Sequence, residues 1–562
     1  MLQYRPRHHD MGIGQPTFKM TSFSMIQNAL LLLALALLTF RLLRAVYRLT
    51  LHPLARFPGP FLSRISSISI PLQAASGDRH LRQLQEHRKY GPIVRIGPNS
   101  LSFSSPTALR TIYQSSRLQN QLRKSDYYKT IDAPAGAYST HSEVGRRKHA
   151  FRRRVLDQAF SEASMRSAEE FVINNVDTLC GLLSNGDSWS QPRRMDDYAT
   201  YFVYDVMGDL VFGKPFDCMT NAEHRFVPKM ITESSKFLYV VAHLPLQFVA
   251  RRLISCEPLM HWLGGQAARD EYHFVAYAAA RMKERIAKEE EKDVRKDMMH
   301  YILNAKDPVT SRSLTQLELE AETSLLIAAG ADTTSSSLAA AFHYLTLPSS
   351  KPVLDYLQRQ LRKKFSVVSF ITWSALKNHT YLRAVVEEIV RLLPAVPSEL
   401  PRTIMQKPGI DIAGEFIPAG TTVGCSAFVL AHDAEAYPSP YAFKPERWIP
   451  KDAETHLAEV SPLQDPEQIA KAREAFCAFS LGSRGCVGKQ LAYMELCLVL
   501  ARVLWTFDMR RAVEQVSVRT KGEAERKGLR WYDDEYQVKD VFLTAREGPL
   551  VEFRKHQTLV EA

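Results

Sequence analysis

Phe479-Ser-Leu-Gly-Ser-Arg-Gly-Cys-Val-Gly488 is the stretch that decides the fold of this chain. It surrounds one cysteine with glycines and leads directly into an apolar helical run from Lys489 to Leu504. A cysteine at the start of a helix meets the positive end of the helix dipole and free backbone N–H groups, and both favour the thiolate. Because no histidine partner stands beside it in the sequence, the pattern favours axial ligation of a haem iron over zinc. A glycine-rich turn around an inert buried cysteine is the alternative interpretation.

A second unusual stretch, Ala328-Ala-Gly-Ala-Asp-Thr-Thr-Ser-Ser-Ser337, interrupts an apolar helix expected over 314–347. Glycine costs about 1 kcal/mol relative to alanine in a helix interior, and threonine and aspartate are also poor helix formers. Asp332 falls on the apolar stripe and is expected to face the interior, while the Thr333 hydroxyl can bond the Ala329 carbonyl and bend the helix. Such conflicts cluster at functional sites, although a face of small residues that lets another helix approach is the simpler interpretation.

Two further motifs are weak signals when each is taken alone. Glu388 and Arg391 lie off the apolar stripe of a helix expected over 380–393, so periodicity favours a solvated ion pair worth a few tenths of a kcal/mol. Some 50 residues later, Phe443-Lys-Pro-Glu-Arg-Trp448 is a proline-led turn whose Arg447 could join that pair in one network.

Composition points to a folded, mainly helical body. The chain has 562 residues, with 72 Lys or Arg against 60 Asp or Glu, and no low-complexity run or repeat divides it. We therefore expect one large domain, mainly α with small β-sheets. Short strands are expected within 93–103 and 409–423. The spacing of apolar residues predicts helices over 151–183, 194–212, 265–304, 314–347, 351–365, 380–393 and 487–507.

The cysteines and the basic residues exclude some classes of function. Seven scattered cysteines without a C-x-x-C pair argue against a disulfide scaffold and a zinc ribbon, and they fit a reduced, cytosol-facing environment. The formal charge of +12 includes a basic cluster over 146–154. Apolar side chains interleave with that cluster, which favours an amphipathic helix inside the fold and no nucleic-acid partner.

The N-terminal region carries a 21-residue uncharged stretch between Lys19 and Arg41. At about 1.5 Å per residue it spans a hydrocarbon core. No small-residue cleavage site follows, so a retained anchor is favoured over a signal peptide or a buried helix. The predicted organisation is a tail (1–19), a transmembrane anchor (20–40), a basic and proline-rich hinge (41–60) and a body (61–562). Basic residues after the span outnumber those before it, which places the body in the cytosol: Arg41, Arg44, Arg48, Arg56 and Arg64 against Arg5, Arg7 and Lys19.

Taken together, in this order and spacing, these motifs resemble the cytochrome P-450 family of haem-thiolate monooxygenases, and in detail its microsomal members from fungal secondary metabolism. The family's cysteine loop F-x-x-G-x-R-x-C-x-G is complete over 479–488. Its A/G-G-x-D/E-T-T/S motif matches 329–334, its E-x-x-R is 388–391, and its P-E-R-F appears as 445–448.

The resemblance implies a haem b whose iron is bound by Cys486 in a loop framed by Phe479 and Gly482. Arg484, Arg402 and Arg153 would meet the haem propionates, because guanidinium groups suit carboxylates. His149 stands where the family often has tryptophan. By the same resemblance Glu388, Arg391 and Arg447 form a buried structural triad, against the solvated pair that periodicity favours.

The implied activity is insertion of one atom of O2 into a lipophilic small molecule, with electrons from NADPH through an NADPH-cytochrome reductase. Thr333 would order water at the site, and Asp332 would supply protons. The implied location is the endoplasmic reticulum membrane, as a single-pass protein with a cytosolic catalytic domain. Two alternatives are a haem-thiolate isomerase or dehydratase, whose members tend to lack the threonine, and a membrane-tethered haem-binding protein without catalysis.

Four segments are candidate walls of the substrate pocket: the loop 117–138 with Tyr127 and Tyr128, the stretch 237–248, the turn 395–400 and the tail 542–544. They are mainly apolar and aromatic, which predicts a lipophilic ligand.

Overall fold

The computed structural model describes residues 18–115, 118, 121–131, 137–245, 247–254, 256–289, 295–450, 465–512, 532 and 534–557. The chain divides into two compact units, 1–56 and 57–562. In the first unit α1 (Phe18–Thr50) continues past the predicted end of the anchor at residue 40. Its segment Met25–Thr50 has a mean hydropathy of 2.1, which makes it a candidate membrane span.

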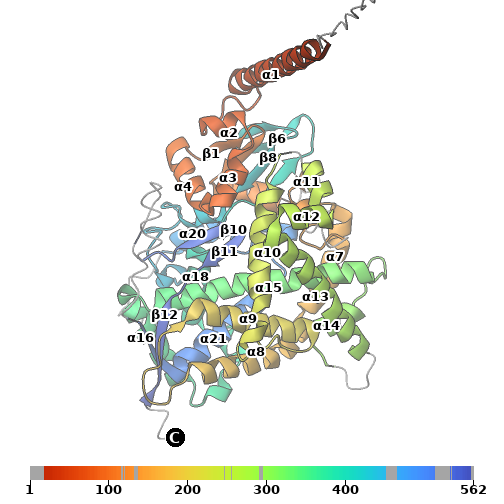
Figure 1. Ribbon diagram of the computed structural model, residues 1–562. Coiled ribbons are helices and arrows are strands. Elements are labelled where there is room, and N and C mark those ends of the chain that lie inside the picture. The colour runs from red at the N-terminus through yellow and green to blue at the C-terminus, as the bar shows by residue number, and fades with distance from the viewer. Residues whose placement is uncertain are drawn as a thin grey trace, which may run out of the picture. The chain divides into compact units, whose positions relative to one another are not determined.

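The second unit is mainly helical (Figure 1). The predicted helix over 151–183 is two helices, α7 and α8, because the chain turns at Phe160 and Ser161. The predicted helix over 265–304 is also two helices, α13 and α14, because α13 ends at Glu289 and α14 begins at Met298. The other predicted helices are present within a few residues at each end, and α10 to α12 add a helical region that periodicity does not predict. The helices are α2 (Phe61–Ile65), α3 (Ser69–Ser76), α4 (Arg79–Tyr90), α5 (Pro106–Leu109), α6 (Tyr128–Ile131), α7 (Arg146–Ala159), α8 (Glu162–Leu183), α9 (Met195–Phe212), α10 (Phe226–Ala242), α11 (Gln247–Ile254), α12 (Glu257–Leu263), α13 (Gly265–Glu289), α14 (Met298–Asn304), α15 (Gln316–Leu345), α16 (Lys351–Lys364), α17 (Trp373–Leu376), α18 (Thr380–Leu392), α19 (Ala427–Ala431), α20 (Pro466–Ala475) and α21 (Lys489–Thr506).

The described residues of this unit also form four small sheets. The largest has the strand order β1-β2-β8-β5-β3, and its β3 and β5 are antiparallel with Lys124 opposite Arg402. The others are β4-β12-β9, β10-β11 and β6-β7. The strands are β1 (Ile93–Gly97), β2 (Ser100–Phe103), β3 (Leu122–Lys124), β4 (Arg193–Arg194), β5 (Arg402–Ile404), β6 (Gly409–Ile412), β7 (Glu415–Pro418), β8 (Thr422–Cys425), β9 (Phe507–Arg511), β10 (Val538–Val541), β11 (Leu543–Arg546) and β12 (Leu550–Lys555).

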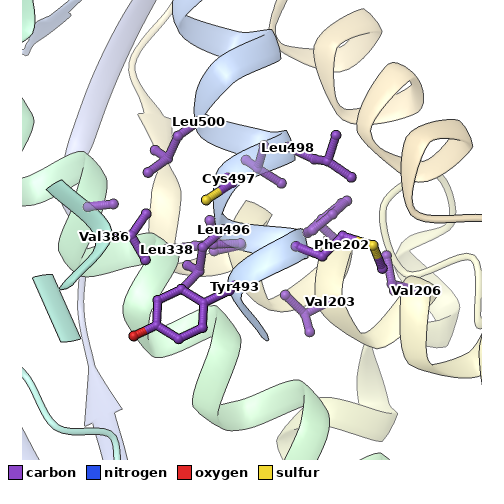
Figure 2. Close-up of a cluster of buried hydrophobic side chains, with 14 of the residues drawn as sticks. Phe202, Val203, Val206, Leu338, Val386, Tyr493, Leu496, Cys497, Leu498 and Leu500 are labelled. Carbon is purple, nitrogen blue, oxygen red and sulfur yellow. The ribbon is translucent and has the colours of Figure 1, made fainter. Parts of the chain in front are cut away.

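The core is built where α9, α15, α18 and α21 pack together. Figure 2 shows Leu496 and Leu498 of α21 among apolar side chains of the neighbouring helices, with Phe202 from α9, Leu338 from α15 and Val386 from α18. All five side chains are at most 1% exposed. Although α15 is apolar enough to cross a membrane, 72% of its most apolar window is buried in the protein, as in a core helix. This core sets α15 and the start of α21 at fixed positions.

Glu388 and Arg391 are buried at the edge of this core, so the solvated pair favoured by periodicity is wrong and the triad implied by the resemblance is confirmed. The Glu388 carboxylate accepts from Arg391 Nη2 at 2.8 Å and from Arg447 Nε at 2.9 Å. It also accepts from Trp448 Nε1 at 3.0 Å and from the Lys444 backbone N–H at 3.1 Å. The triad therefore ties α18 to the segment that holds Pro445–Trp448.

Candidate active site

A cavity of about 300 Å³ lies between α15 and the cysteine loop, residues 479–488. Ala329, Gly330 and Thr333 line it from α15, and Cys486 lines it from the loop. Ala329 is exposed although most of the helix around it is buried, because this face of α15 is the cavity wall. The two stretches singled out in the sequence thus line a single space.

The geometry of the cysteine loop depends on glycine. A 3-10 turn, η8 (Gly482–Arg484), is followed by a hydrogen bond of 2.9 Å from the Cys486 N–H to the Phe479 carbonyl. Gly482 has φ +70°, and a Cβ at this position would lie 2.2 Å from the Tyr113 carbonyl oxygen. A side chain is excluded both by the left-handed backbone and by that close approach. The loop ends where α21 begins at Lys489.

The Cys486 thiol is placed as the sequence predicts, but its protonation is set by two opposed effects. Burial raises the pKa of Cys486 above its ordinary value. Hydrogen bonds from the backbone N–H groups of Gly488 and Lys489, and the positive charges of Arg153 and Lys489, act to lower it. The helix start alone therefore does not secure the thiolate, and a metal cation at the sulfur would supply the remaining stabilisation.

On α15, neighbouring residues point in different directions. The Thr333 hydroxyl lines the cavity and donates to the Ala329 carbonyl at 2.7 Å, the bond that the sequence predicts. Asp332 is only 6% exposed and lies outside the cavity, where its Oδ1 accepts from the Tyr204 hydroxyl at 2.9 Å. Burial raises the pKa of Asp332 to about 6, while Arg546 and Tyr204 act to lower it. Gly330 also fits the packing interpretation, since a Cβ there would meet Met207 of α9 at 2.7 Å.

A concentration of positive charge lies at one end of the cavity. Arg484 donates to the carbonyls of Glu143 and Val144, and Arg402 donates to the Tyr128 hydroxyl, so the partners of both are neutral. Neither forms an ion pair with any residue that the structure describes. Burial and the charge of Arg402 lower the pKa of Arg484 to about 10. Buried cations without a counter-ion are costly, which indicates that an anionic group belongs between them.

Arg153, His149 and Phe479 also line the cavity, whereas Gly482 does not. Arg402 lines a smaller neighbouring cavity of about 200 Å³ together with Arg484. The Arg153 guanidinium is already engaged, by Asp157 at 2.6 Å and by the Gly485 carbonyl at 2.6 Å. His149 is buried, and this burial together with the nearby cations lowers its pKa to about 2, so the ring is neutral. A neutral imidazole still has one N–H to donate.

Lys124 lies in the predicted wall 117–138, but the sequence does not single it out as a residue of the site. It lines the cavity from β3, where strand pairing sets it opposite Arg402, and its ammonium group donates to the His141 carbonyl. No motif surrounds it, so only the strand register could have revealed it.

The basic cluster 146–154 lies within α7, as expected for an amphipathic helix inside the fold. Three of its six basic residues form ion pairs within the protein: Arg152 with Glu322, Arg153 with Asp157 and Arg154 with Asp307.

Three of the four predicted pocket walls contribute residues to the cavity. The loop 117–138 contributes Lys124, the turn 395–400 contributes Ala395, Val396, Ser398 and Leu400, and the tail contributes Phe542 and Leu543. Tyr127 and Tyr128 are buried behind this wall, and the stretch 237–248 does not reach the cavity where it is described. Parts of the loop 117–138 and of that stretch lie outside the described residues.

One cavity thus holds Cys486, just before the start of α21, and Thr333 of α15, with Arg484 at its lining and Arg402 in the neighbouring cavity. The family model described as "Cytochrome P450" matches residues 58–538. The chain is 35% identical to "Cytochrome P450 monooxygenase fscF" of Fusarium equiseti, covering 91% of this chain and 93% of that protein. It is 32% identical to "Cytochrome P450 monooxygenase atnE" of Emericella nidulans, with the same coverage of each chain. The crystal structure of the cytochrome P450DA heme domain shares the fold, with a TM-score of 0.67 over 86% of this chain and 94% of that one at 17% identity.

The chain therefore belongs to the cytochrome P-450 family. It is a haem-thiolate monooxygenase, as the resemblance of its motifs implies.

Proposed function

We propose that this protein is a membrane-anchored monooxygenase that oxidises a lipophilic small molecule, in secondary-metabolite biosynthesis, with electrons from NADPH through a reductase. The observation that carries this proposal is that Cys486 of the cysteine loop and Thr333 of α15 line one cavity. In such a reaction one substrate, one O2, two electrons and two protons give one oxygenated product and one water.

The residues present fit a haem b. Cys486 would bind the iron, and Arg484 and Arg402 would receive the propionates, with Lys124 and His149 beside them. The neutral partners of Arg484 and Arg402 support the assignment, because two carboxylates would neutralise these guanidinium groups. Bound there, the haem supplies activation of O2, and a thiolate ligand favours cleavage of the O–O bond.

The chain's own contribution to the chemistry is proton supply. In our proposal the Thr333 hydroxyl, tethered to the Ala329 carbonyl, orders a water molecule at the cavity wall. Asp332, with a pKa of about 6, exchanges protons near neutral pH, which suits a general acid. Because Asp332 lies on the far side of α15 from the cavity, it would act as the reservoir that reprotonates this water.

A lipophilic substrate is supported by four apolar residues that line the cavity from the turn 395–400 and the tail 542–544: Val396, Leu400, Phe542 and Leu543. The candidate span in α1 and the arginine excess after it support a single-pass anchor with the body in the cytosol, at the endoplasmic reticulum. Arg147, Lys148 and Lys489 are exposed near the cysteine loop and offer a surface for an acidic reductase. Lys148→Glu should then raise the KM for reductase, while the exposed Lys351→Glu should not.

The decisive experiment compares Thr333→Ala with Thr323→Ala. Thr323 is on the same helix and makes the same bond, to the Leu319 carbonyl at 2.7 Å, but it does not line the cavity. Each variant is reconstituted with reductase and a panel of terpenoid and polyketide scaffolds, and NADPH consumed, peroxide released and product formed are measured together. Thr333→Ala should divert NADPH into peroxide, whereas Thr323→Ala should keep the wild-type ratio.

The alternative of a haem-thiolate isomerase or dehydratase gives the opposite result. Such an enzyme consumes no NADPH, so product formation independent of NADPH, with no effect of Thr333→Ala, would establish it. Haem binding without any product would establish the non-catalytic alternative. The presence of Thr333 at the cavity favours the monooxygenase.

A further inference from the structure

The tip of the β10–β11 hairpin holds a phenylalanine in an unusual backbone conformation. Val541 pairs with Leu543 across the hairpin, so Phe542 alone forms the turn. Its φ is +81°, in a region that residues other than glycine rarely adopt. The Phe542 side chain lines the cavity. Because such backbone strain persists only where the surrounding structure enforces it, another group must hold this residue in place.

The Asp540 carboxylate is the group that holds this turn. Its Oδ1 accepts from the Phe542 backbone N–H at 3.1 Å, and its Oδ2 accepts from the Tyr239 hydroxyl at 3.2 Å and from the Ser398 hydroxyl. Asp540 is fully buried, whereas Ser398 lines the cavity. One buried carboxylate therefore ties together two walls of the cavity, the turn 395–400 and the tail 542–544.

The partners of this carboxylate are themselves fixed by residues of α4. Arg79 of α4 donates to the Tyr239 hydroxyl of α10 at 2.9 Å and forms an ion pair with Glu399. Gln83, one turn further along α4, donates to the same Glu399 carboxylate. Arg79, Tyr239 and Glu399 are at most 7% exposed. Because groups buried in this way have no water to take the place of these partners, the network resists movement of Asp540.

The Phe542 ring is packed against other aromatic rings. Its centroid lies 6.0 Å from that of Tyr239, 6.4 Å from that of Tyr127 and 5.5 Å from that of His141. Tyr127 and Tyr239 are buried, and His141 lines the cavity with Phe542. An apolar molecule in the cavity would thus meet an aromatic surface whose position depends on the backbone at residue 542.

We propose that Asp540 is a positioning residue: by holding the Phe542 turn, it fixes the wall against which the lipophilic substrate packs and so determines which carbon of the substrate is oxidised. Apolar contacts are not directional, so the shape of the wall decides how such a molecule lies in the cavity. If Asp540 only stabilised the fold, its loss would leave this selectivity unchanged. The inference rests on the proposed function, which supplies the lipophilic substrate.

The first measurement uses the full-length holoprotein and two probes, imidazole and N-phenylimidazole, whose free ring nitrogen binds haem iron and shifts its absorption spectrum. The second probe adds a ring that can pack on the wall. Phe542→Gly, in which glycine accepts the left-handed backbone, should weaken N-phenylimidazole binding about fivefold and leave imidazole binding unchanged, because an aromatic contact is lost. Asp540→Ala should give the same change, and the double variant should show no more, since Asp540 acts through Phe542.

The second measurement is the ratio of products from the scaffold that gave the most product in the panel, which should change in both single variants. Asp540→Asn should restore both ratios, because its Oδ1 still accepts from the Phe542 N–H and the two hydroxyls at Oδ2 can turn to accept from the amide. The matched control is Asp433→Ala, which should leave both ratios unchanged. The Asp433 Oδ1 also accepts from the N–H two residues further on, that of Glu435, at 2.9 Å, but neither residue lines the cavity.

A wild-type affinity ratio or product ratio in Asp540→Ala would overturn the proposal, and so would effects of the two single variants that add in the double variant. If Asp540→Ala holds no haem, hydrogen exchange at the wild-type Phe542 amide decides. A slow exchange supports the bond to a buried carboxylate, and exchange as fast as in an exposed loop overturns the proposal. Probe binding needs no oxygenation, so this result is independent of the proposed function, which fails instead if Thr333→Ala leaves coupling unchanged.

Discussion

Replacing Glu388 by glutamine keeps the shape of the side chain and removes one buried charge. The carboxylate is fully buried and receives hydrogen bonds from Arg391, Arg447, Trp448 and the Lys444 backbone. Burial alone would raise the pKa of Glu388, but Arg391 and Arg447 hold it below its ordinary value, so the group is charged. Every group that contacts the carboxylate is a hydrogen-bond donor. The amide nitrogen of glutamine is a donor too, so it would face one of these N–H groups without forming a hydrogen bond.

The expected cost follows from the two guanidinium groups left without a counter-ion. Removing one partner of a buried ion pair costs about 3–5 kcal/mol, a large part of the roughly 5–15 kcal/mol by which folded proteins are stable. The matched control is Glu284→Gln, whose carboxylate is 56% exposed and pairs with Lys214 and Arg281. An exposed pair contributes about 1 kcal/mol or less.

The assay is urea unfolding of the full chain in detergent micelles, followed by tryptophan fluorescence and by the carbon monoxide spectrum, together with the yield of holoprotein. Glu388→Gln should give little holoprotein and a much lower midpoint, and Glu284→Gln should match the wild type. Equal midpoints and equal haem content in the two variants would refute the argument that the triad is held by buried charge.

Cys486→Ser should abolish the red-shifted carbon monoxide spectrum of thiolate-bound haem, and Cys477→Ser should keep it; a red-shifted spectrum in the first would show that another residue binds the iron. Gly482→Ala should lower haem incorporation, because the new Cβ would lie 2.2 Å from a carbonyl oxygen in a left-handed turn; normal holoprotein yield would mean that the loop can move aside. Deleting residues 1–45 should release most of the protein from sedimentable membrane, and unchanged sedimentation would contradict the anchor. Asn378, within an Asn-His-Thr sequon, should stay unmodified in a eukaryotic host, since glycan there would place the body in the lumen.

Several features of this protein depend only on residues that are close together in the sequence, and the sequence predicts these features. The cysteine loop needs glycine at position 482 and a helix beginning at Lys489, and both features lie within ten residues of sequence. The Thr333 bond to the Ala329 carbonyl joins residues four apart, so helical geometry alone predicts it. The apolar run that becomes α1 is likewise visible without any partner.

The apolar periodicity gave a wrong prediction where the partners of a side chain are distant in the sequence. Glu388 and Arg391 lie off the apolar stripe of α18, yet both are buried, because Arg447 and Trp448, 59 and 60 residues from Glu388, cover that face. A helical pattern reports only the face that meets the apolar core. It carries no information about a polar face covered by another segment, and the resemblance of several motifs together was needed to predict the triad.

The sequence by itself determined the class of protein, the cysteine and threonine at its centre, and the helical nature of its body. Only the tertiary structure decided that Asp332 faces away from the cavity toward Tyr204, that Lys124 stands beside Arg402, and that Arg546 reaches α15 from β11. The physical reason is that hydrogen-bond and helix geometry act over a few residues of chain. Strand register and the contacts between elements distant in sequence depend on how all the elements pack together in the core.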